Sequence, residues 1–407
     1  MNARGDILAA PLVIDSAAPV GARARPDFRL RSGSAELFAR STDVPAEIWA
    51  ATFGDSPKDF AYYRLIEETM TSHFSYRYLL MRGSARVAVA LQPLIIADQD
   101  LTASSGAIVR QIAKAFRRLA PRFLRTRMLM AGCLVGDGKL GVIAGADSLE
   151  AAALLGEGLL AVAKRERISL ITVKDFPAEF REVLAPLTST GYCRLPSFPP
   201  MKLELDFSTF DEYMQRRLGK ITRKGLRRKL RKAGEAKPAI KLEVTDDCRD
   251  VIDEIYPLYL AVAGRSDVSF EIFTKEYFVE ASRRMPERFR FFIWRQGGRA
   301  VAFSFCTIWR DAIYDNDIGL DYSVAHELNL YYVTFRDLLE WALAHGLRTY
   351  HSAPFNYDPK LHLRLQPEPV DIYVRHTSPI LNAALGWVAP AFAPAKSDPA
   401  LRRYRAS

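Results

Sequence analysis

The sequence has few cysteines and no long apolar run. Its four cysteines, Cys133, Cys193, Cys248 and Cys306, are far apart and form no CxxC pair. We therefore expect neither a disulfide framework nor a zinc knuckle, which is typical of a reducing compartment. The sequence has no run of eighteen apolar residues, so we expect no membrane-spanning helix. The N-terminus does not have the pattern of a signal peptide. The expected location is the cytoplasm, either free or as a peripheral protein on the inner face of the membrane.

The motifs of several enzyme classes are missing as well. His326-Glu327 has no second histidine at the HExxH spacing, so no zincin site and no metal are expected. The sequence contains no Gly-rich loop ending in Gly-Lys-Ser/Thr, no GxSxG elbow and no GxGxxG after a strand. P-loop nucleotide chemistry, serine hydrolase chemistry and dinucleotide binding are excluded on these grounds.

The length of 407 residues is too great for one compact core, although 49% apolar and 26% charged residues are ordinary for a globular chain. We predict a disordered tail over 1–26, a first unit over 27–206, a second unit over 207–395 and a basic tail over 396–407. Both units alternate helices and strands and echo each other near their ends. The expected fold class is α/β, with two units of mixed, mostly antiparallel sheets flanked by helices.

Periodicity places the elements of both units. In the first unit it predicts helices over 45–53, 58–72, 108–119 and 149–165, and strands over 76–81, 87–96, 168–173 and 201–207. In the second unit it predicts helices over 211–233, 251–263 and 330–345, and strands over 241–244, 289–294, 300–309, 312–318, 348–351 and 370–375. In this interpretation the strands 201–207 and 370–375 each close their own unit.

The excess of positive charge is concentrated in one segment. Lys and Arg number 57 against 47 Asp and Glu, giving a net charge of +10, and ten basic residues without one acid lie between Arg216 and Lys232. This predicted helix could hold substrate phosphates, lie on an anionic membrane or bind nucleic acid. Nucleic acid is the weakest of the three, because no aromatic residue for base stacking occurs between Tyr213 and Tyr256. A helix face that is only solvated is the less favoured alternative, because ten like charges repel one another unless an anion binds them.

Acidic residues gather before the loop 319–328, which leads into the helix 330–345. Asp315, Asp317 and Asp321 occur there, and either Asp317 or Asp321 at the end of a strand could accept a proton from an attacking amine. The competing interpretation is a solvated turn. The loop itself would present backbone N–H groups at a helix N-terminus, which suits an anion such as a pyrophosphate; the alternative is a plain connection.

A lysine follows the short strand 348–351. Lys360 occurs in the run Tyr357-Asp358-Pro359-Lys360, where a cation could neutralise charge on a carbonyl oxygen or a leaving phosphate. The alternative is an exposed loop lysine.

Together these features resemble a known family. The segment from Tyr213 to Ala233, the meander, the loop-to-helix turn and the Tyr357–Lys360–Leu363 stretch resemble the GNAT-superfamily acyltransferases of the BioF2-like and FemAB-like type. The resemblance covers 207–376 and extends more faintly over 28–206, where such proteins carry a degenerate first copy. One departure is that the Gln/Arg-x-x-Gly-x-Gly/Ala signature expected near 319–330 is replaced by GLDYSVAHELNL.

The resemblance implies an N-acyltransferase that moves an acyl group from an activated donor to an amine of an anionic acceptor. The donor would be acyl-CoA, as a co-substrate with no bound cofactor, or aminoacyl-tRNA; no other nucleic acid is expected. The acceptor would be a small molecule or a cell-envelope precursor. The expected catalytic residues are Asp317, Asp321 and Lys360. Expected binding residues are Arg223, Lys224, Arg227, Arg228 and Tyr357 for the substrate, and the amides of Leu328, Asn329 and Leu330 for the donor phosphate.

A second interpretation comes from another class of protein. The same scaffold could serve as a non-catalytic adaptor that binds anions or an anionic membrane surface through the basic helix. Stabilisation of the fold by acyl-CoA would separate the two, because a ligand at a hundred times its dissociation constant adds about 2.7 kcal/mol.

Overall fold

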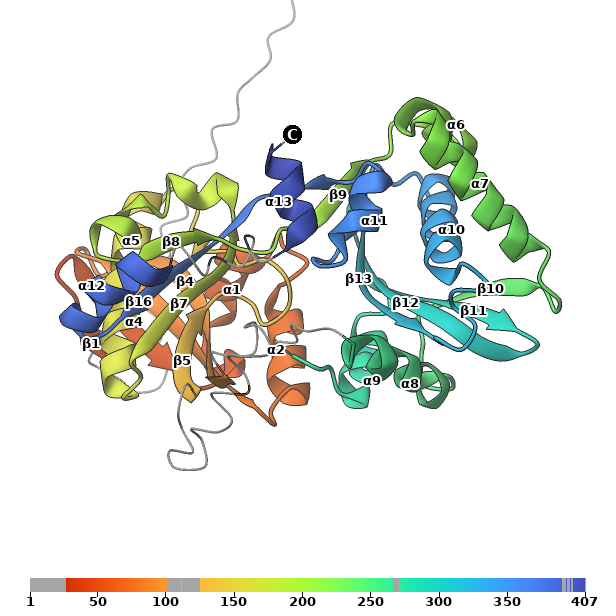
Figure 1. The fold of residues 1–407 in the computed structure, drawn as a ribbon. Helices are drawn as coiled ribbons and strands as arrows, with labels where there is room; N and C mark the ends of the chain where they lie inside the picture. Colours follow the sequence, from red (N-terminus) through yellow and green to blue (C-terminus); the bar gives the residue numbers. More distant parts are fainter. Residues whose placement is uncertain are drawn as a thin grey trace, which may run out of the picture.

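The computed structural model describes residues 27–100, 111, 125–265, 271–389, 393, 396 and 398–406. It contains two sheets, each flanked by helices (Figure 1). The expected fold class, with mixed and mostly antiparallel sheets, is confirmed. The predicted tail 1–26 lies outside the described residues, as does the predicted helix 108–119 apart from Gln111.

The first sheet has the strand order β1-β2-β3-β4-β5-β7-β16-β8, with β6 beside β4. Its strands are β1 (Phe28–Arg29), β2 (Gly33–Phe38), β3 (Phe74–Gly83), β4 (Ala88–Asp100), β5 (Arg125–Ala131), β6 (Gly141–Val142), β7 (Leu170–Pro177), β8 (Cys193–Pro196) and β16 (Val370–His376). All pairings are antiparallel except that of β5 with β7. A parallel pair needs a crossover, and here the crossover includes the helix α4 (Ser148–Arg165).

The second sheet has the order β10-β11-β12-β13-β14-β9-β15. Its strands are β9 (Met201–Glu204), β10 (Ile240–Thr245), β11 (Phe289–Gln296), β12 (Arg299–Trp309), β13 (Ala312–Leu320), β14 (Thr349–Ser352) and β15 (Gln366–Pro367). Its one parallel pair, β13 with β14, is connected through the helix α10 (Leu330–Ala344). Within the described residues, each sheet therefore has one parallel pair with a helical crossover.

Helices cover both faces of each sheet. Those of the first unit are α1 (Ala46–Phe53), α2 (Phe60–Thr69), α4 and α5 (Ala185–Ser189), with 3-10 turns η1 (Ser41–Asp43) and η2 (Ala178–Arg181). Those that follow are α6 (Phe210–Arg217), α7 (Lys220–Gly234), α8 (Ile252–Ala263), α9 (Lys275–Arg284), α10, α11 (Tyr357–His362), α12 (Pro379–Val388) and α13 (Pro399–Ala406). Buried apolar side chains of α4 form one core, those of α6 and α10 a second, and α1, α2, α8 and α9 share a third that joins the units.

The two units exchange their closing strands. β9 precedes the second unit's helices and joins the second sheet through β14, whereas β16 returns to the first sheet and lies between β7 and β8. Figure 1 shows the blue β16 among the strands of the first unit. The expectation that 201–207 and 370–375 each close their own unit is therefore wrong. If the units are divided by their sheets, β9 belongs to the second unit and β16 to the first, which differs from the predicted boundary at 206. The local sequence pattern of a strand does not specify which sheet it joins.

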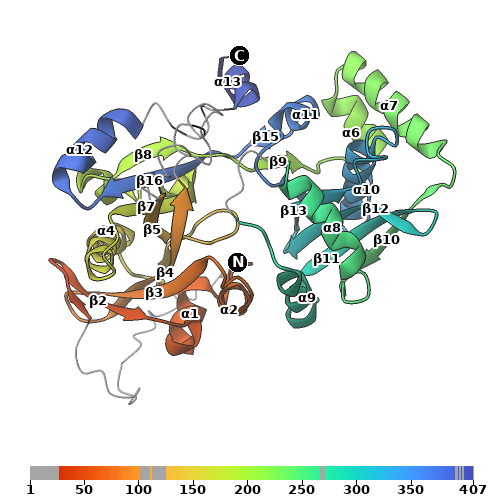
Figure 2. The same ribbon diagram turned by 60° about the horizontal axis from the view of Figure 1, so that its bottom comes forward.

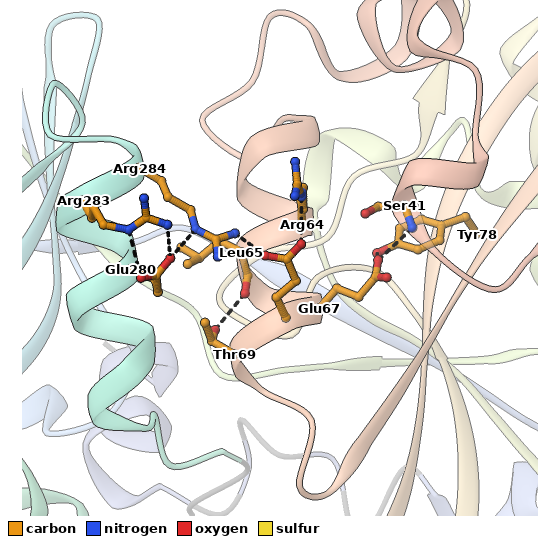
Figure 3. Close-up of polar contacts among 10 residues, drawn as sticks. Ser41, Arg64, Leu65, Glu67, Thr69, Tyr78, Glu280, Arg283 and Arg284 are labelled. Carbon is orange, nitrogen blue, oxygen red and sulfur yellow. Dashed lines mark hydrogen bonds and ion pairs between the residues drawn. The ribbon is translucent and has the colours of Figure 1, made fainter.

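Ion pairs and a shared core hold the units together. Arg288 follows α9, and its guanidinium lies 2.5 Å from the carboxylate of Asp59, the N-cap residue of α2. Figure 3 shows α9 beside α2, with Arg284 directed toward the first unit; Arg284 bonds Glu68 of α2 and Glu280 of its own helix. Because core residues of both units pack in one apolar cluster, the interface is continuous rather than a hinge between separate cores.

Two further segments differ from expectation. The predicted helix 211–233 is two helices, because Leu218 and Gly219 adopt extended backbone angles between α6 and α7. Glycine has low helix propensity, which lowers the cost of the break at that point. The segment predicted as a basic tail over 396–407 contains the helix α13, whose Leu401 is buried in the second core.

Candidate active site

The site begins where β13 and β14 separate. Their parallel ladder runs from Ala312–Thr349 to Asp315–Ser352, and the amide of Ala353 then donates to the carbonyl of Asp315. Beyond that point β13 pairs, among the described strands, only with β12, as far as Leu320. This leaves a strand edge that can pair with an extended, amide-bearing ligand.

A β-bulge lies at the same point. Cys306 pairs with Asp315 and Phe305 with Asp317, so Asn316 is the extra residue on β13. Paired residues of antiparallel strands share a face, and Cys306 belongs to the core under α10 whereas Phe305 belongs to the core under α8 and α9. The bulge therefore directs Asp315 and Asp317 to opposite faces, which is a common use of bulges near active sites.

Asp317 faces the boundary between the two units and is half-buried. Desolvation, then the nearby Glu271 and Asp315, raise its pKa to about 8. Glu271 has a pKa of about 7, raised by desolvation and by Asp175 against the opposing effect of Lys174. Lys174 and Asp175 belong to β7 of the first unit, so charged groups from both units meet here. A carboxyl whose pKa lies near the pH at which the protein works is suited to proton transfer.

Asp315 and Lys360 occupy the other face. The Asp315 carboxylate accepts a hydrogen bond of 2.8 Å from the Tyr350 hydroxyl, and desolvation raises its pKa. Lys360 lies in α11 and is only 7% exposed, with its ammonium 2.5 Å from the carbonyl oxygen of Ala353. Desolvation lowers the Lys360 pKa to about 8, opposed by Asp315. The geometry does not fit an exposed loop lysine.

Asp321 is not brought to either group. Its carboxylate lies 2.8 Å from Arg299 and accepts a 2.6 Å hydrogen bond from the Ser323 hydroxyl. Desolvation alone would raise the pKa of Asp321, but the hydrogen bonds from Ser323 and the charge of Arg299 lower the pKa overall. A carboxylate held ionised by an arginine is a weak base, so the position of Asp321 favours a structural role in the turn.

The loop amides predicted to cradle a phosphate already have partners. The amide of Leu328 donates to Val324, that of Asn329 to His326 and that of Leu330 to Ala325, all to carbonyl oxygens. These bonds close the helical turns of the loop. An anion at these three amides would have to displace them.

The predicted substrate-binding cations lie on α7, away from Asp317. α7 packs through Leu226 and Ala233 onto the core under α10, and its Lys229 ammonium lies 3.6 Å from the centroid of the Tyr332 ring in the first turn of α10. The predicted four residues differ in their contacts: Arg223 donates to the carbonyl of Gln215 and Arg227 lies 3.8 Å from Asp211, whereas Lys224 and Arg228 are exposed. Among the residues that the structure describes, no ion-pair partner is found for Lys220, Lys224, Arg228 or Lys232.

Tyr357 is packed rather than open to a ligand. It is 1% exposed, and its hydroxyl donates a 3.1 Å hydrogen bond to the carbonyl of Pro199 in the connection between the units. Its position supports a structural role for this residue.

Sequence reasoning missed Glu271 and Lys174. Neither is part of a motif, and 97 residues (271 − 174) separate them in the chain. Their proximity follows only from how the two units pack, and no local signal could have indicated it. Among the described residues, no three His, Cys, Asp or Glu side chains group closely enough to hold a metal ion.

Comparison with known proteins identifies the second unit. Residues 220–360 match a family model described as an acetyltransferase (GNAT) domain. This range runs from α7 to Lys360 and includes the bulge, the separating strands and α10. No curated protein matches the sequence.

Similar solved structures share little sequence with this chain. A putative lysylphosphatidylglycerol synthetase C-terminal domain from Agrobacterium fabrum is 10% identical, with a TM-score of 0.48, over 85% of this chain and 92% of that one. FemX is 10% identical, with a TM-score of 0.48, over 77% and 90%. A tandem GNAT protein from the clavulanic acid biosynthesis pathway is 10% identical, with a TM-score of 0.46, over 82% and 94%.

Residues 220–360 thus match a GNAT domain, and the expected class of enzyme, a GNAT-type N-acyltransferase, is confirmed. GNAT domains use acyl-CoA as co-substrate.

Proposed function

We propose that this protein transfers an acyl group from acyl-CoA to an amine of an anionic acceptor, with the amine bound between the two units. The observation that carries the proposal is the position of Asp317. The bulge at Asn316 places this half-buried carboxyl, with its pKa of about 8, on the face shared by both units and beside Glu271.

In this proposal the donor enters between β13 and β14. Its amide-bearing arm pairs with the free edge of β13 beyond Asp315, which brings the thioester carbonyl near the bulge. The exposed cations of α7 beside the first turn of α10 hold the donor's phosphates, in place of the occupied amides of Leu328 to Leu330. Cations on a helix surface attract such groups over a range of about 8–10 Å in physiological salt.

The acceptor amine approaches from the side of the first unit. Its ammonium form is attracted by Asp317 and Glu271, and Asp317 first takes one proton from it, which leaves a neutral amine. The amine nitrogen then attacks the carbonyl carbon, the C–S bond breaks, and the second proton of the nitrogen passes to the departing CoA thiolate. Holding both reactants in line supplies much of the rate without a covalent intermediate, while the Lys360 ammonium at the end of β14 stabilises the negative charge that develops on the carbonyl oxygen or the leaving group.

Donor turnover tests the proposal. Protein, acetyl-CoA and a small-molecule cell extract are incubated, CoA thiol release is measured, and mass spectrometry identifies the acetylated amine. Asp317→Asn should slow turnover about 10²–10⁴-fold, the usual contribution of a general base, whereas Asp321→Asn should have a much smaller effect. Acetyl-CoA that neither turns over nor stabilises the fold would instead favour the non-catalytic adaptor. Equal losses in both variants would remove Asp317 from its proposed role.

A further inference from the structure

The strand β10 forms an open edge of the second sheet. It pairs with β11 on one side, and among the described strands it has no partner on the other. Figure 2 shows β10 on the side of that sheet away from the first unit. Its four inner residues, 241–244, are all exposed. The unpaired backbone N–H and C=O groups of such an edge can pair with a further strand.

Apolar side chains reach this edge on the face covered by α7 and α10. Leu242 pairs with Trp294 across the ladder. Val244 pairs with Phe292, which like Trp294 belongs to the core under α10. Because directly paired residues share a face, Leu242 and Val244 extend this apolar row to the rim of the sheet. Each is 37% exposed, and a strand added at the edge would cover both.

Charged side chains lie on the opposite face of the same strand. Lys241 pairs with Arg295 of β11, so two cations stand opposite each other, which is unfavourable in a sheet. The Arg295 guanidinium is compensated by carboxylates of Glu243 and Glu254, each at 2.7 Å. Among the residues that the structure describes, no ion-pair partner is found for Lys241. The edge therefore carries a cation without an anion, two positions before the half-exposed carboxylate of Glu243.

The sequence of β10 is complementary to a second copy of itself. Two antiparallel copies related by a two-fold axis through Leu242 would place Lys241 of each opposite Glu243 of the other. On the other face Leu242 would meet its own counterpart, and Ile240 would meet Val244. Symmetric registers centred on Lys241 or on Glu243 would instead bring identical charges together. The order Ile-Lys-Leu-Glu-Val thus favours one register of an isologous contact.

We propose that β10 pairs with β10 of a second copy of this chain, in the antiparallel register centred on Leu242, so that the two second sheets join into one. A second copy fits this edge because it supplies both the anion that Lys241 lacks and apolar partners for Leu242 and Val244. A six-residue strand forms a small interface, so the dimer should dissociate on dilution. Because β11 and β12 lie between β10 and β13, the inference is independent of the proposed reaction.

Sedimentation velocity of the full chain tests the pairing, across the micromolar range and at physiological ionic strength. The parent should dimerise as its concentration rises. Lys241→Glu should weaken the dimer at least about tenfold, because it places two pairs of carboxylates across the axis. This variant should still fold, since its new carboxylate lies opposite Arg295. The double variant Lys241→Glu/Glu243→Lys restores opposite charges across the axis and should dimerise like the parent, and both variants should keep the parent's turnover.

Cysteine cross-linking under mild oxidation tests the register with a matched pair of variants. Leu242→Cys places two thiols opposite each other at the axis, where Cβ atoms are about 5 Å apart and a small adjustment allows a disulfide. Val244 has the same exposure as Leu242, but its counterpart would lie four residues away along the second strand, about 13 Å. Leu242→Cys should therefore form a covalent dimer, whereas Val244→Cys and the parent should not.

Three results would overturn the proposal. The first is a parent that stays monomeric at every concentration. The second is a dimer that Lys241→Glu leaves unchanged, because the contact would then lie elsewhere on the molecule, or a double variant that dimerises no better than Lys241→Glu. The third is cross-linking of Val244→Cys in preference to Leu242→Cys, which would exclude the register on which the charge pairing depends.

Discussion

Asp315 and Asp317 lie two positions apart on β13, yet their carboxyls face opposite sides of the second sheet. In a regular strand such residues share a face, and both would then lie in one core. The extra residue Asn316 separates them, and its side-chain amide donates a 2.7 Å hydrogen bond to the Thr307 hydroxyl across the ladder. One carboxyl is paired with Tyr350, and the other is left at the boundary between the units.

The first prediction concerns Asp317 and stability. Its pKa is about 8 in the folded protein against about 3.9 in an unfolded chain, so the folded state binds the proton more tightly. Raising the pH from about 4 to about 8 deprotonates the unfolded chain first, and the free energy of unfolding should fall over that window. Asp317→Asn cannot lose this proton. Its thermal midpoint should therefore exceed that of the parent at pH 8, and the difference should shrink toward pH 4.

Calorimetry at several pH values measures this difference, with Asp321→Asn as the control. Asp321 has a lowered pKa and an arginine partner, so its variant should lose stability at neutral pH rather than gain it. A less stable Asp317→Asn protein at pH 8 would contradict the environment described for this carboxyl.

The pH dependence of turnover reports on the same carboxyl. If Asp317 is the base, kcat/KM should rise with pH and level off above about 8, because the group must be deprotonated to act.

The second prediction concerns the cations of α7. Lys224→Gln combined with Arg228→Gln should raise the KM for acyl-CoA by at least about tenfold, because charge-assisted hydrogen bonds contribute about 1.5 kcal/mol or more each. The salt dependence of KM should flatten as well. The control is Arg29→Gln with Lys241→Gln, which removes two exposed cations elsewhere. A parent KM that does not change between low and high salt would contradict this role for α7.

The sequence predicted the features that depend on residues close together in the chain, and missed those that depend on residues far apart in it. Helices and strands with a clear period, such as α4 and the β11–β13 meander, were found close to their predicted bounds, because local patterning decides them. The exchange of β9 and β16 was not predicted, since their alternating patterns are compatible with either sheet. For the candidate site, Asp317 was proposed from its place before the loop. Glu271 and Lys174 were not, because their relation to Asp317 exists only after the units dock.

The third prediction concerns the docking of the units. Arg288 and Asp59 pair with side-chain exposures of 15% and 21%, and the Arg288 guanidinium also lies 5.2 Å from the Trp309 ring centroid. Arg288→Met should cost about 1–3 kcal/mol in unfolding free energy, because Asp59 would be left without its partner in a half-buried position. Urea unfolding measures it.

Arg310 offers a matched control at the same interface. It pairs with Asp55 across the units, but the side chains are 62% and 76% exposed. Exposed pairs contribute little, so Arg310→Met should cost within about 0.5 kcal/mol. If Arg310→Met proves the more costly change, burial is not what makes the Arg288 contact important.

The last prediction concerns Lys360, whose substitution should lower turnover far more than it lowers substrate affinity. The ammonium is held at the end of β14 by the carbonyl of Ala353. Besides the nearby Asp315, a cation there gains a further negative partner as the carbonyl oxygen or the leaving group acquires charge. Interactions made only in the transition state affect kcat rather than binding. Lys360→Met should therefore lose on the order of 3 kcal/mol of transition-state stabilisation, about a hundredfold in rate.

Stability separates this role from a structural one. The Lys360 pKa is about 8 when folded and about 10.4 when unfolded, so the folded state holds this proton less tightly. The parent should gain stability as the pH rises from about 8 to about 10.4. At pH 7 the neutral Lys360→Met protein should be at least as stable as the parent while its turnover falls. A stable variant that turns over at the parent rate would exclude Lys360 from the site, and a variant that loses stability and rate together would assign it to supporting β14.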